Sequence, residues 1–360
     1  MGRLMRFRMT AVELGAAAGV FRLARALQKP KLSVLTYHGF IDHDRRYVGQ
    51  YAYLYRYCVS ADRLGEQISF LKRTAHIVDA EEFLHIVDTG VVPRHSVLLT
   101  IDDALRSVID VALPVFAVYD IRPIILVPTN GPNTAESATP WTQWHESLAG
   151  LILTDATAIA GSWRNFKDIL AKLPLSPNGD ALTMIKVLRE AAWSSDSELH
   201  TELIRRAREA VGREPDPDLL RYSETSGLVM ESMTWNQIRT ASLYGAEIGG
   251  HTITHPRLSL LSNSSLKREL TQSAVDIEKQ IGTPCRFFAL PYGHPADFHP
   301  SQAAVLAQAG YHVAFTQEGG PCALPPQPLH ISRTGIESVS TQAQVEFFTS
   351  RRPIRIASEN

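Results

Sequence analysis

Two short motifs in this sequence carry side chains that could bind a metal ion and activate water. Asp102 and Asp103 are adjacent at the end of an apolar run, and their side chains point locally to opposite sides. His251 and His255 are four positions apart, so one turn of chain can bring both imidazoles to a single ion. Asp103, His251 and His255 then offer one carboxylate and two imidazoles, while Asp102 stays available as a general base. Zn²⁺ suits this set best, and iron, cobalt and manganese are also compatible with it.

A third motif could stabilise negative charge during a reaction. Pro291 and Gly293 flank Tyr292 and predict a tight turn just after an apolar run. The backbone N–H of Tyr292 could then donate a hydrogen bond to an oxyanion. Taken alone, this tripeptide is also what an ordinary turn looks like, so its meaning depends on where the fold places it.

The elements around these motifs alternate between short β-branched runs and amphipathic helical patterns. This alternation predicts parallel strands joined by crossover helices. The predicted strands are Lys31–Tyr37, Val97–Ile101, Pro123–Val127, Ala246–Gly250, Arg286–Leu290, Tyr311–Thr316 and Leu329–Ile336. About seven such units are enough to close a barrel, and the three motifs all follow the carboxyl ends of strands, so we expect them at one rim.

Helix start and stop signals fit the same pattern. Ser60 predicts an N-cap, and Gly90 predicts the end of the helix Ala80–Asp88. Pro114 predicts a bend or a fresh start within the helical pattern Leu105–Val118. Further helices are predicted over Thr234–Leu243, from Ser262 or Asn263 to Gly282, and over Ser301–Ala309.

The alternation lapses between about residues 129 and 225. Only helical patterns occur after a turn-rich stretch, over Trp141–Leu153, Phe166–Leu173, Ala181–Trp193 and Ser197–Val211. We interpret this as a helical insertion into one barrel domain, serving either as a wall beside the substrate or as added packing area. The predicted domains are an N-terminal amphipathic helix or arm at 1–30, the barrel at 31–345 and a C-terminal tail at 346–360.

Composition excludes several functional classes. The 360 residues carry a formal net charge of −1, which gives no overall electrostatic footprint for nucleic acid or for an anionic membrane. Three scattered cysteines, Cys58, Cys285 and Cys322, predict neither a disulfide framework nor a thiolate zinc site. No stretch approaches the roughly 20 apolar residues of a membrane span. Glu13 interrupts the first apolar run, so we expect a cytoplasmic protein, with export as the alternative.

In combination, the three motifs resemble those of the NodB-like polysaccharide deacetylases, carbohydrate esterase family 4. Thr100-Ile-Asp-Asp-Ala104 is similar to the TFDDG motif of that family, His251–His255 to its HxxxH motif and Pro291–Gly293 to its PYG turn. Leu35-Thr-Tyr-His-Gly39 also resembles the entry strand of members from exopolysaccharide gene clusters. The resemblance covers roughly residues 31–128 and 230–336, which leaves the insertion and both termini outside it.

The resemblance implies a distorted (β/α)7 barrel and metal-dependent removal of an acetyl group from an N-acetylated sugar. It assigns Asp102 as the general base, and Asp103, His251 and His255 as the metal ligands. It also assigns the backbone N–H of Tyr292 as the oxyanion donor. The implied cofactor is a divalent metal, with Zn²⁺ as the leading choice, and the implied partner is an acetylated saccharide.

The sequence departs from the family pattern at several positions. Ala104 replaces a glycine and Ile101 a phenylalanine, and Ala289 stands where many members carry an arginine. Arg286 or Arg333 could replace that arginine beside the base. The general acid is expected to be His330, in Leu329-His330, with His38 and His294 as rivals. We expect His38, Pro291, Gly293 and Arg333 along the substrate-binding rim.

Three functions are therefore compatible with the sequence. The first is deacetylation of an N-acetylated saccharide or saccharide precursor, such as a lipid-linked or nucleotide-linked sugar. The second keeps the site and changes the bond, as in a deformylase or another hydrolase of non-peptide amides. The third is a degenerate barrel that binds saccharide or a biosynthetic partner without turnover. The oligomeric state cannot be predicted from the sequence.

Overall fold

The computed structural model describes most of the barrel and part of the insertion. The described residues are 3–26, 30–43, 57–92, 94–132, 197–212, 231–293, 297, 299–338 and 340–350, with 151, 155, 157–159, 161–166 and 168. Among them, no helix is long and apolar enough to cross a bilayer.

Eight described strands form one parallel sheet, ordered β10-β1-β5-β6-β7-β8-β9, with β4 beside the first half of β5. These strands are β1 (Leu32–Tyr37), β4 (His76–Val78), β5 (Ser96–Ile101), β6 (Ile124–Val127), β7 (Glu247–Gly250), β8 (Phe287–Ala289), β9 (Val313–Phe315) and β10 (Thr334–Gly335). A parallel bridge between Phe315 and Ile331 ties the segment before β10 back to β9, so the sheet curls on itself. The predicted distorted (β/α)7 barrel is confirmed.

All seven predicted strands are present, and the last is shorter than expected. Leu329–Ile336 contains only β10 and the single bridge at Ile331. Three strands were not predicted: β4, and the pair β2 (Gly39–Ile41) and β3 (Cys58–Ser60), which form a separate small sheet.

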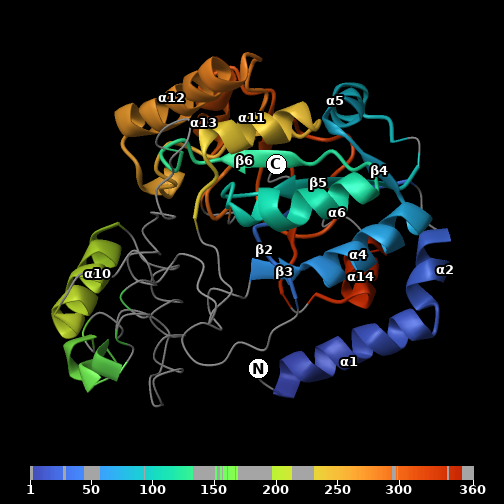
Figure 1. The fold of residues 1–360 in the computed structure, drawn as a ribbon, viewed down its shortest axis with the longest axis horizontal. Coiled ribbons are helices and arrows are strands. Elements are labelled where there is room, and N and C mark those ends of the chain that lie inside the picture. The colour runs from blue at the N-terminus through green and yellow to red at the C-terminus, as the bar shows by residue number, and fades with distance from the viewer. Residues whose placement is uncertain are drawn as a thin grey trace, which may run out of the picture.

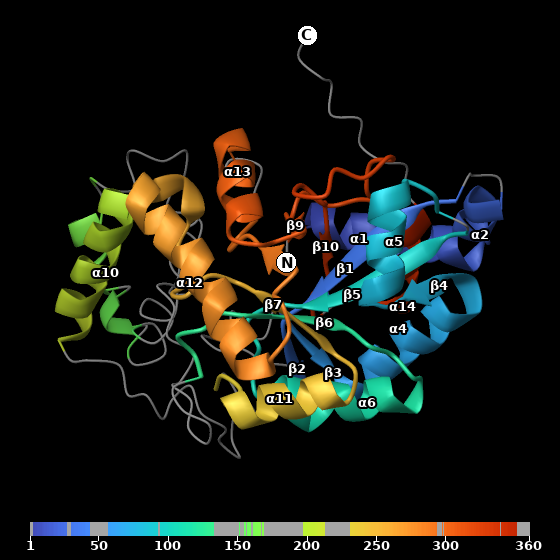
Figure 2. The same cartoon turned by 90° about the horizontal axis from the view of Figure 1, so that it is seen from above.

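Helices cover the outside of the curled sheet (Figures 1 and 2). They are α4 (Ala61–Thr74), α6 (Leu113–Val118), α11 (Trp235–Leu243), α12 (Asn263–Ile281), α13 (Pro300–Gln308) and α14 (Gln342–Ser350), whereas α5 (Ala80–Thr89) packs into the interior core. The predicted caps are confirmed where the structure shows them. Ser60 and Ser262 accept backbone hydrogen bonds at the starts of α4 and α12, and Gly90 and Gly282 take the left-handed conformation at helix ends. A π-helical turn (Val108–Ala112) leads into α6, which begins afresh beside Pro114.

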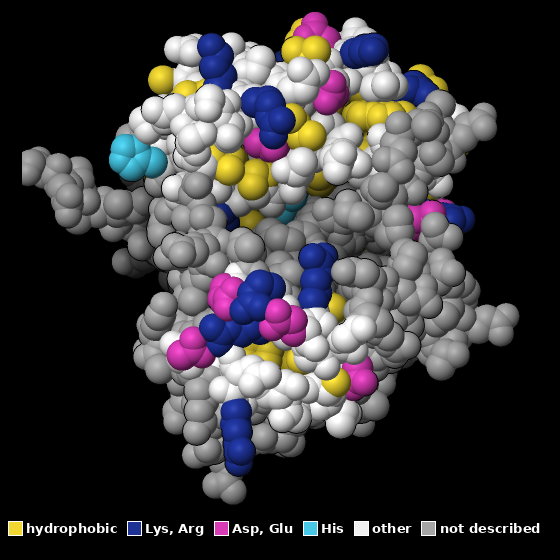
Figure 3. Space-filling model, turned by 90° about the vertical axis from the view of Figure 1, so that its left-hand side faces the viewer, with side chains coloured by type: hydrophobic (Ala, Val, Ile, Leu, Met, Phe, Trp, Pro, Cys, Tyr) yellow, Lys and Arg dark blue, Asp and Glu magenta, His cyan; other side chains and the backbone are white. Residues whose placement is uncertain are grey.

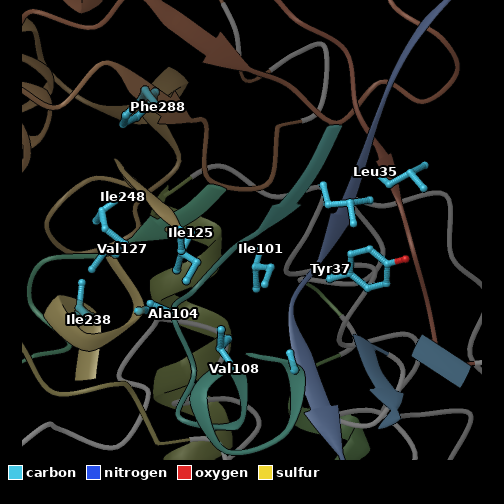
Figure 4. Packing of buried hydrophobic residues seen from close by; sticks show 14 of the residues in the cluster. Leu35, Tyr37, Ile101, Ala104, Val108, Ile125, Val127, Ile238, Ile248 and Phe288 are labelled. Carbon is cyan, nitrogen blue, oxygen red and sulfur yellow. The ribbon is translucent and has the colours of Figure 1, made fainter. Parts of the chain in front are cut away.

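Alternate residues of each strand separate into two cores. One set packs outward under the helices, in a cluster that includes Leu35, Ile101 and Ile125 of the strands and Ile238 of α11, the last drawn near Val127 and Ile248 (Figure 4). The other set fills the interior of the barrel with buried apolar side chains from six strands and from α5. Phe83 of α5 contacts the rings of Phe287 and Phe315 there, so this helix closes the amino-terminal end of the barrel. Catalytic residues are therefore left to the opposite, carboxyl-terminal rim.

The N-terminal arm forms two helices instead of the expected single one. Gly19 adopts a positive φ of 72° and separates α1 (Arg3–Ala17) from α2 (Val20–Ala26). The ring of Phe21 packs against Phe347 of α14, whereas Leu14 of α1 is 66% exposed. The predicted boundary at residue 345 falls inside α14, so the first part of the expected tail packs on the arm.

The insertion is described only in part. α10 (Ser197–Val211) coincides with the predicted last helix, and a short 3-10 helix spans Trp163–Phe166. The predicted helices Trp141–Leu153, Phe166–Leu173 and Ala181–Trp193 lie largely or wholly outside the described residues. Acidic and basic side chains gather over α10 (Figure 3), where Arg205 and Arg206 pair with Glu202 and Asp168.

Candidate metal-centred active site

The turn after β5 presents two buried carboxylates in a constrained backbone. Asp102 and Asp103 are each 4% exposed, and Asp103 and Ala104 have positive φ values of 71° and 45°. Such conformations cost free energy in residues with a Cβ and persist only where surrounding contacts fix them. Here the carbonyl oxygen of Ala104 accepts a hydrogen bond from the backbone N–H of Met233, in the segment that re-enters the barrel after the insertion. Ala104, which stands where the family motif has a glycine, therefore adopts a left-handed backbone conformation despite its Cβ.

The turn after β7 presents two buried imidazoles. His251 follows Gly250 directly, and the chain then turns through Thr252 (φ 67°) to His255 (φ 54°). The hydroxyl of Thr252 accepts a hydrogen bond from the His255 backbone N–H at 2.8 Å. The carboxylate of Glu269, on α12, accepts hydrogen bonds from the loop between the two histidines. Both imidazoles are consequently held on a turn that faces the Asp102-Asp103 turn.

The three predicted metal ligands lie together. Oδ1 of Asp103 is 3.7 Å from Nε2 of His251 and 3.6 Å from Nε2 of His255. Donors about 2.1 Å from a tetrahedral ion would be about 3.4 Å apart, which is close to these separations. Among the described residues, this is the one cluster of His, Cys, Asp or Glu in which three potential ligand atoms lie within 4.8 Å of one another.

The donor atoms also point the right way for a cation. Nδ1 of His251 lies 2.8 Å from the carbonyl oxygen of Ala289, so this nitrogen carries the proton and donates. Nε2 then presents its lone pair toward Asp103. Burial lowers the pKa of His251, which favours the neutral imidazole that binds metals. The donor set and its orientation therefore fit a divalent ion such as Zn²⁺.

Asp102 has a different partner from Asp103. Its two carboxylate oxygens each accept a hydrogen bond of 2.7 Å from the two terminal nitrogens of Arg333. Burial raises the pKa of the Asp102 carboxyl, but Arg333, by charge and hydrogen bonds, together with the nearby His251 and His38, lowers it more, so the net shift is downward. Asp102 is therefore a carboxylate at neutral pH, held in a fixed orientation beside the three potential ligands.

The position of Arg333 decides between the two roles the sequence left open for it. It is 1% exposed, donates from Nε to the carbonyl oxygen of Thr316 and lies over the ring of Phe315 inside the barrel. Arg333 is therefore the partner of Asp102, the candidate base, and lies beneath it in the barrel instead of along the expected substrate-binding rim. Arg286, the alternative partner, instead pairs with Glu81 and Glu247, at the amino-terminal end of β7.

Of the candidate general acids, His38 lies nearest the base. Nε2 of His38 is 4.0 Å from Oδ2 of Asp102, and its side chain is 24% exposed. Burial lowers the pKa of His38 to about 4, partly opposed by the charge of Asp102. His330, the acid expected from the sequence, pairs instead with Glu318 at 2.5 Å, because the chain before β10 turns at this point. His294 lies outside the described residues.

The predicted turn after β8 forms one wall of the site. Tyr292 has a positive φ of 62°, and its ring packs edge-on against the ring of His255 at 5.0 Å. The guanidinium of Arg257 lies over the Tyr292 ring and pairs with the buried Asp297. Gly293 also has a positive φ, and a Cβ there would lie 2.8 Å from the Gln317 backbone nitrogen. Pro291 and Gly293 are both buried, so they shape the turn that carries the Tyr292 backbone.

Glu269 and the Arg257–Asp297 pair were not predicted from the sequence. Glu269 could have been identified from the sequence. It is three positions from Leu266, on the buried face of α12, where a charged residue requires partners. Arg257 and Asp297 are separated by forty positions, and no periodicity connects them.

Comparisons with known proteins agree with this arrangement. Residues 209–314 match the family model described as polysaccharide deacetylase, a segment that includes the histidine and Pro-Tyr-Gly motifs. The Streptococcus pyogenes deacetylase PplD is similar over 89% of this chain and 99% of its own, with 14% identity and a TM-score of 0.56. IcaB from Ammonifex degensii is similar over 90% of this chain and 99% of its own, with 16% identity and a TM-score of 0.52. A de-N-acetylase from Aggregatibacter actinomycetemcomitans matches over 88% and 99%, with 15% identity and a TM-score of 0.53.

A search of curated proteins finds no match. At these identities, the likeness to solved structures establishes the fold. The family model independently confirms the resemblance drawn from the three motifs.

Proposed function

We propose that this chain, a relative of the polysaccharide deacetylases by its motifs and its family match, is a metal-dependent hydrolase that removes acetyl groups from an N-acetylated saccharide. The observation that carries this proposal is the pair of adjacent carboxylates with separate partners. Asp103 lies with His251 and His255, and Asp102 lies with Arg333. A cation site and a general base thus stand side by side, as hydrolysis of an amide requires.

Asp103, His251 and His255 are the residues that would hold the metal, for which we propose Zn²⁺. When bound, a divalent metal polarises the acyl carbonyl and lowers the pKa of a bound water. Asp102 accepts the proton of the attacking water, and Arg333 keeps this carboxylate ionised and correctly oriented. This division of roles requires that Asp102 remain unprotonated at working pH, which its lowered pKa supports.

Two further groups complete the proposed chemistry. The backbone N–H of Tyr292 donates to the oxyanion that develops as water adds to the carbonyl. His38 lies 4.0 Å from Asp102, and because burial lowers its pKa to about 4, it serves as the acid by passing on the proton that Asp102 takes from water to the departing sugar nitrogen. We therefore propose His38 in place of His330 as the general acid. The substrate is an acetylated saccharide or precursor, and a cytoplasmic location, with export as the alternative, remains the prediction from the sequence.

The test is acetate release by the purified protein from a panel of N-acetylated oligosaccharides and nucleotide-linked sugars. We expect Asp102→Asn to lower kcat by about 10²–10⁴-fold, because a general base contributes on this scale. Chelation should abolish release, and adding Zn²⁺ should restore it. Asp110→Asn, at a half-exposed carboxylate paired with Arg106, is the matched control and should keep full activity.

Two outcomes would contradict the proposal. Metal bound at the site with no acyl release from any amide or ester would exclude deacetylation and related hydrolysis. Tight saccharide binding that survives Asp102→Asn, in a wild type without turnover, would instead support a binding protein. Formate release in place of acetate would show that the same site cleaves a formamide bond, as in a deformylase.

A further inference from the structure

Glu269 makes an unusual set of hydrogen bonds for a side chain on a long helix. It lies in the second turn of α12, is 3% exposed and faces the loop between His251 and His255. Its Oε2 accepts hydrogen bonds from the backbone N–H groups of Ile253 and Thr254, at 2.8 and 3.0 Å. Its Oε1 accepts a third from the hydroxyl of Thr254, at 2.9 Å. Both carboxylate oxygens are therefore engaged by the histidine loop.

Backbone pairing fixes only one side of this loop. Thr252 and His255 both adopt positive φ values, so the chain between them is neither strand nor helix. Carbonyl oxygens at 252 and 253 accept from Thr129 and Asn130, after β6. The N–H groups point the other way, and three successive ones bond to side-chain oxygens, two to Glu269 and that of His255 to Thr252.

The position of the Glu269 carboxylate is itself fixed by packing. Leu266 and Leu270 are buried on either side of it, and Ser273, one turn later, bonds to Tyr311 at 2.7 Å. The nearest basic side chain, Arg268, is 72% exposed and 3.9 Å away, so most of the compensation for this buried charge comes from the loop N–H groups. A loop that lost this acceptor would leave two backbone N–H groups without their partner.

We propose that Glu269 is a positioning residue that sets the spacing and orientation of His251 and His255 before any ion binds. The inference rests on the proposed metal site. Outer groups that orient ligands typically change metal affinity by about 10–100-fold when removed. Glu269 differs from the usual case because its hydrogen bonds go to the backbone and hydroxyl of the residues between the two histidines.

The experiment measures Zn²⁺ binding to metal-free protein by calorimetry, with the absorption spectrum of bound Co²⁺ as a second readout. We expect Glu269→Ala to weaken Zn²⁺ binding by about 10–100-fold and to alter the Co²⁺ spectrum. Glu269→Gln should restore most of the affinity, because its oxygen can accept from both loop N–H groups while its amide donates to Thr254. Glu278→Gln, at an exposed carboxylate on the same helix, is the control and should bind as wild type.

Hydrogen exchange of the Ile253 and Thr254 amides in metal-free wild type tests the same idea without a variant. Slow exchange, which becomes fast in Glu269→Ala, is expected. Fast exchange in the metal-free wild type, or wild-type Zn²⁺ affinity in folded Glu269→Ala, would overturn the role of Glu269 alone. A wild type that binds no metal would overturn both this role and the proposed function.

Discussion

Asp102 and Asp103 are neighbours in the chain and yet occupy different electrostatic environments. The even-numbered residues of β5 face the interior of the barrel, which directs Asp102 onto Arg333. The left-handed backbone at Asp103 then turns the next carboxylate toward the two histidines. Two like charges can be tolerated side by side because each has its own source of positive charge or hydrogen-bond donors.

Arg333→Met tests this separation of roles. The methionine keeps apolar volume but removes the charge that offsets burial, so the pKa of Asp102 should rise. The acid limb of the kcat/KM profile should therefore move to higher pH, and kcat should fall at neutral pH. Because an uncompensated buried charge remains, we also expect a loss of about 3–5 kcal/mol in unfolding free energy, measured in urea.

Arg286→Met provides the comparison, since that arginine is partly exposed and pairs with Glu81 and Glu247 away from the site. It should leave the pH profile unchanged. An acid limb that stays in place in Arg333→Met would show that Asp102 does not set that limb.

The sequence predicted which residues form the candidate metal site better than it predicted the residues that hydrogen-bond to Asp102 or lie beside it. Asp103, His251 and His255 could be predicted to meet because each follows a strand of a parallel sheet. The choice between Arg286 and Arg333 could not be made, because it depends on which end of the barrel each side chain occupies. His330 was expected to be the general acid only because of its place in the order of the motifs. Its pairing with Glu318 depends on a turn before β10 that no sequence pattern predicts.

At the level of elements, α5 has a structural role that its length does not suggest. This ten-residue helix places Phe83 inside the barrel against Phe287 and Phe315, and Arg333 lies over the ring of Phe315. The amino-terminal end of the barrel interior is thus apolar, and the polar groups lie only toward its carboxyl-terminal end. The packed rings of Phe83 and Phe315 help to hold Arg333 in place, since its guanidinium lies over the Phe315 ring.

Phe83→Ala should remove this support. Truncation of a fully buried phenylalanine typically costs about 3–5 kcal/mol, from lost burial and from the cavity that remains. The measurement is the urea midpoint, with Val118→Ala, at an exposed side chain, as the control expected to change stability by less than about 0.5 kcal/mol. A urea midpoint for Phe83→Ala equal to that of wild type would mean that the neighbouring side chains repack to fill the cavity with no loss of stability.

Element prediction succeeded where periodicity was long and failed where elements were short. The start of α4, the end of α5 and both ends of α12 follow from Ser60, Gly90, Ser262 and Gly282. β2, β3 and β4 have three residues each, which is too few to show an alternating pattern. β10 was overestimated because the apolar residues before it bridge β9 at one position only.

For the whole molecule, the described ends of the insertion lie next to each other and next to the catalytic turn. Ser232 forms an antiparallel bridge with Leu105, and a Cβ on Gly131 would lie 2.6 Å from the Ser232 hydroxyl. The buried residues within the insertion belong to neither of the two barrel cores. These are Leu151, Ile159, Phe166, Leu203 and Ala207.

Replacing residues 133–230 with a short Gly/Ser linker should therefore leave the barrel folded. We expect cooperative unfolding and Zn²⁺ binding within about tenfold of the intact chain, because both ends of the cut already meet. The KM for oligosaccharides should rise by a larger factor if the insertion forms a wall for substrate. Unchanged KM would indicate that it only adds packing area, and loss of Zn²⁺ binding would show that it supports the catalytic turn.

The partner of Asp102, Arg333, directly precedes the last strand β10 and lies 231 positions after Asp102 in the chain. During synthesis, Asp102 emerges from the ribosome long before Arg333, and β10 pairs with β1 at the opposite end of the chain. A nascent chain that has made β1 to β8, with Asp103, His251 and His255, still has no counter-ion for Asp102. Assembly of the complete site therefore waits for the segment just before β10, and a product truncated before Arg333 would lack the partner of Asp102.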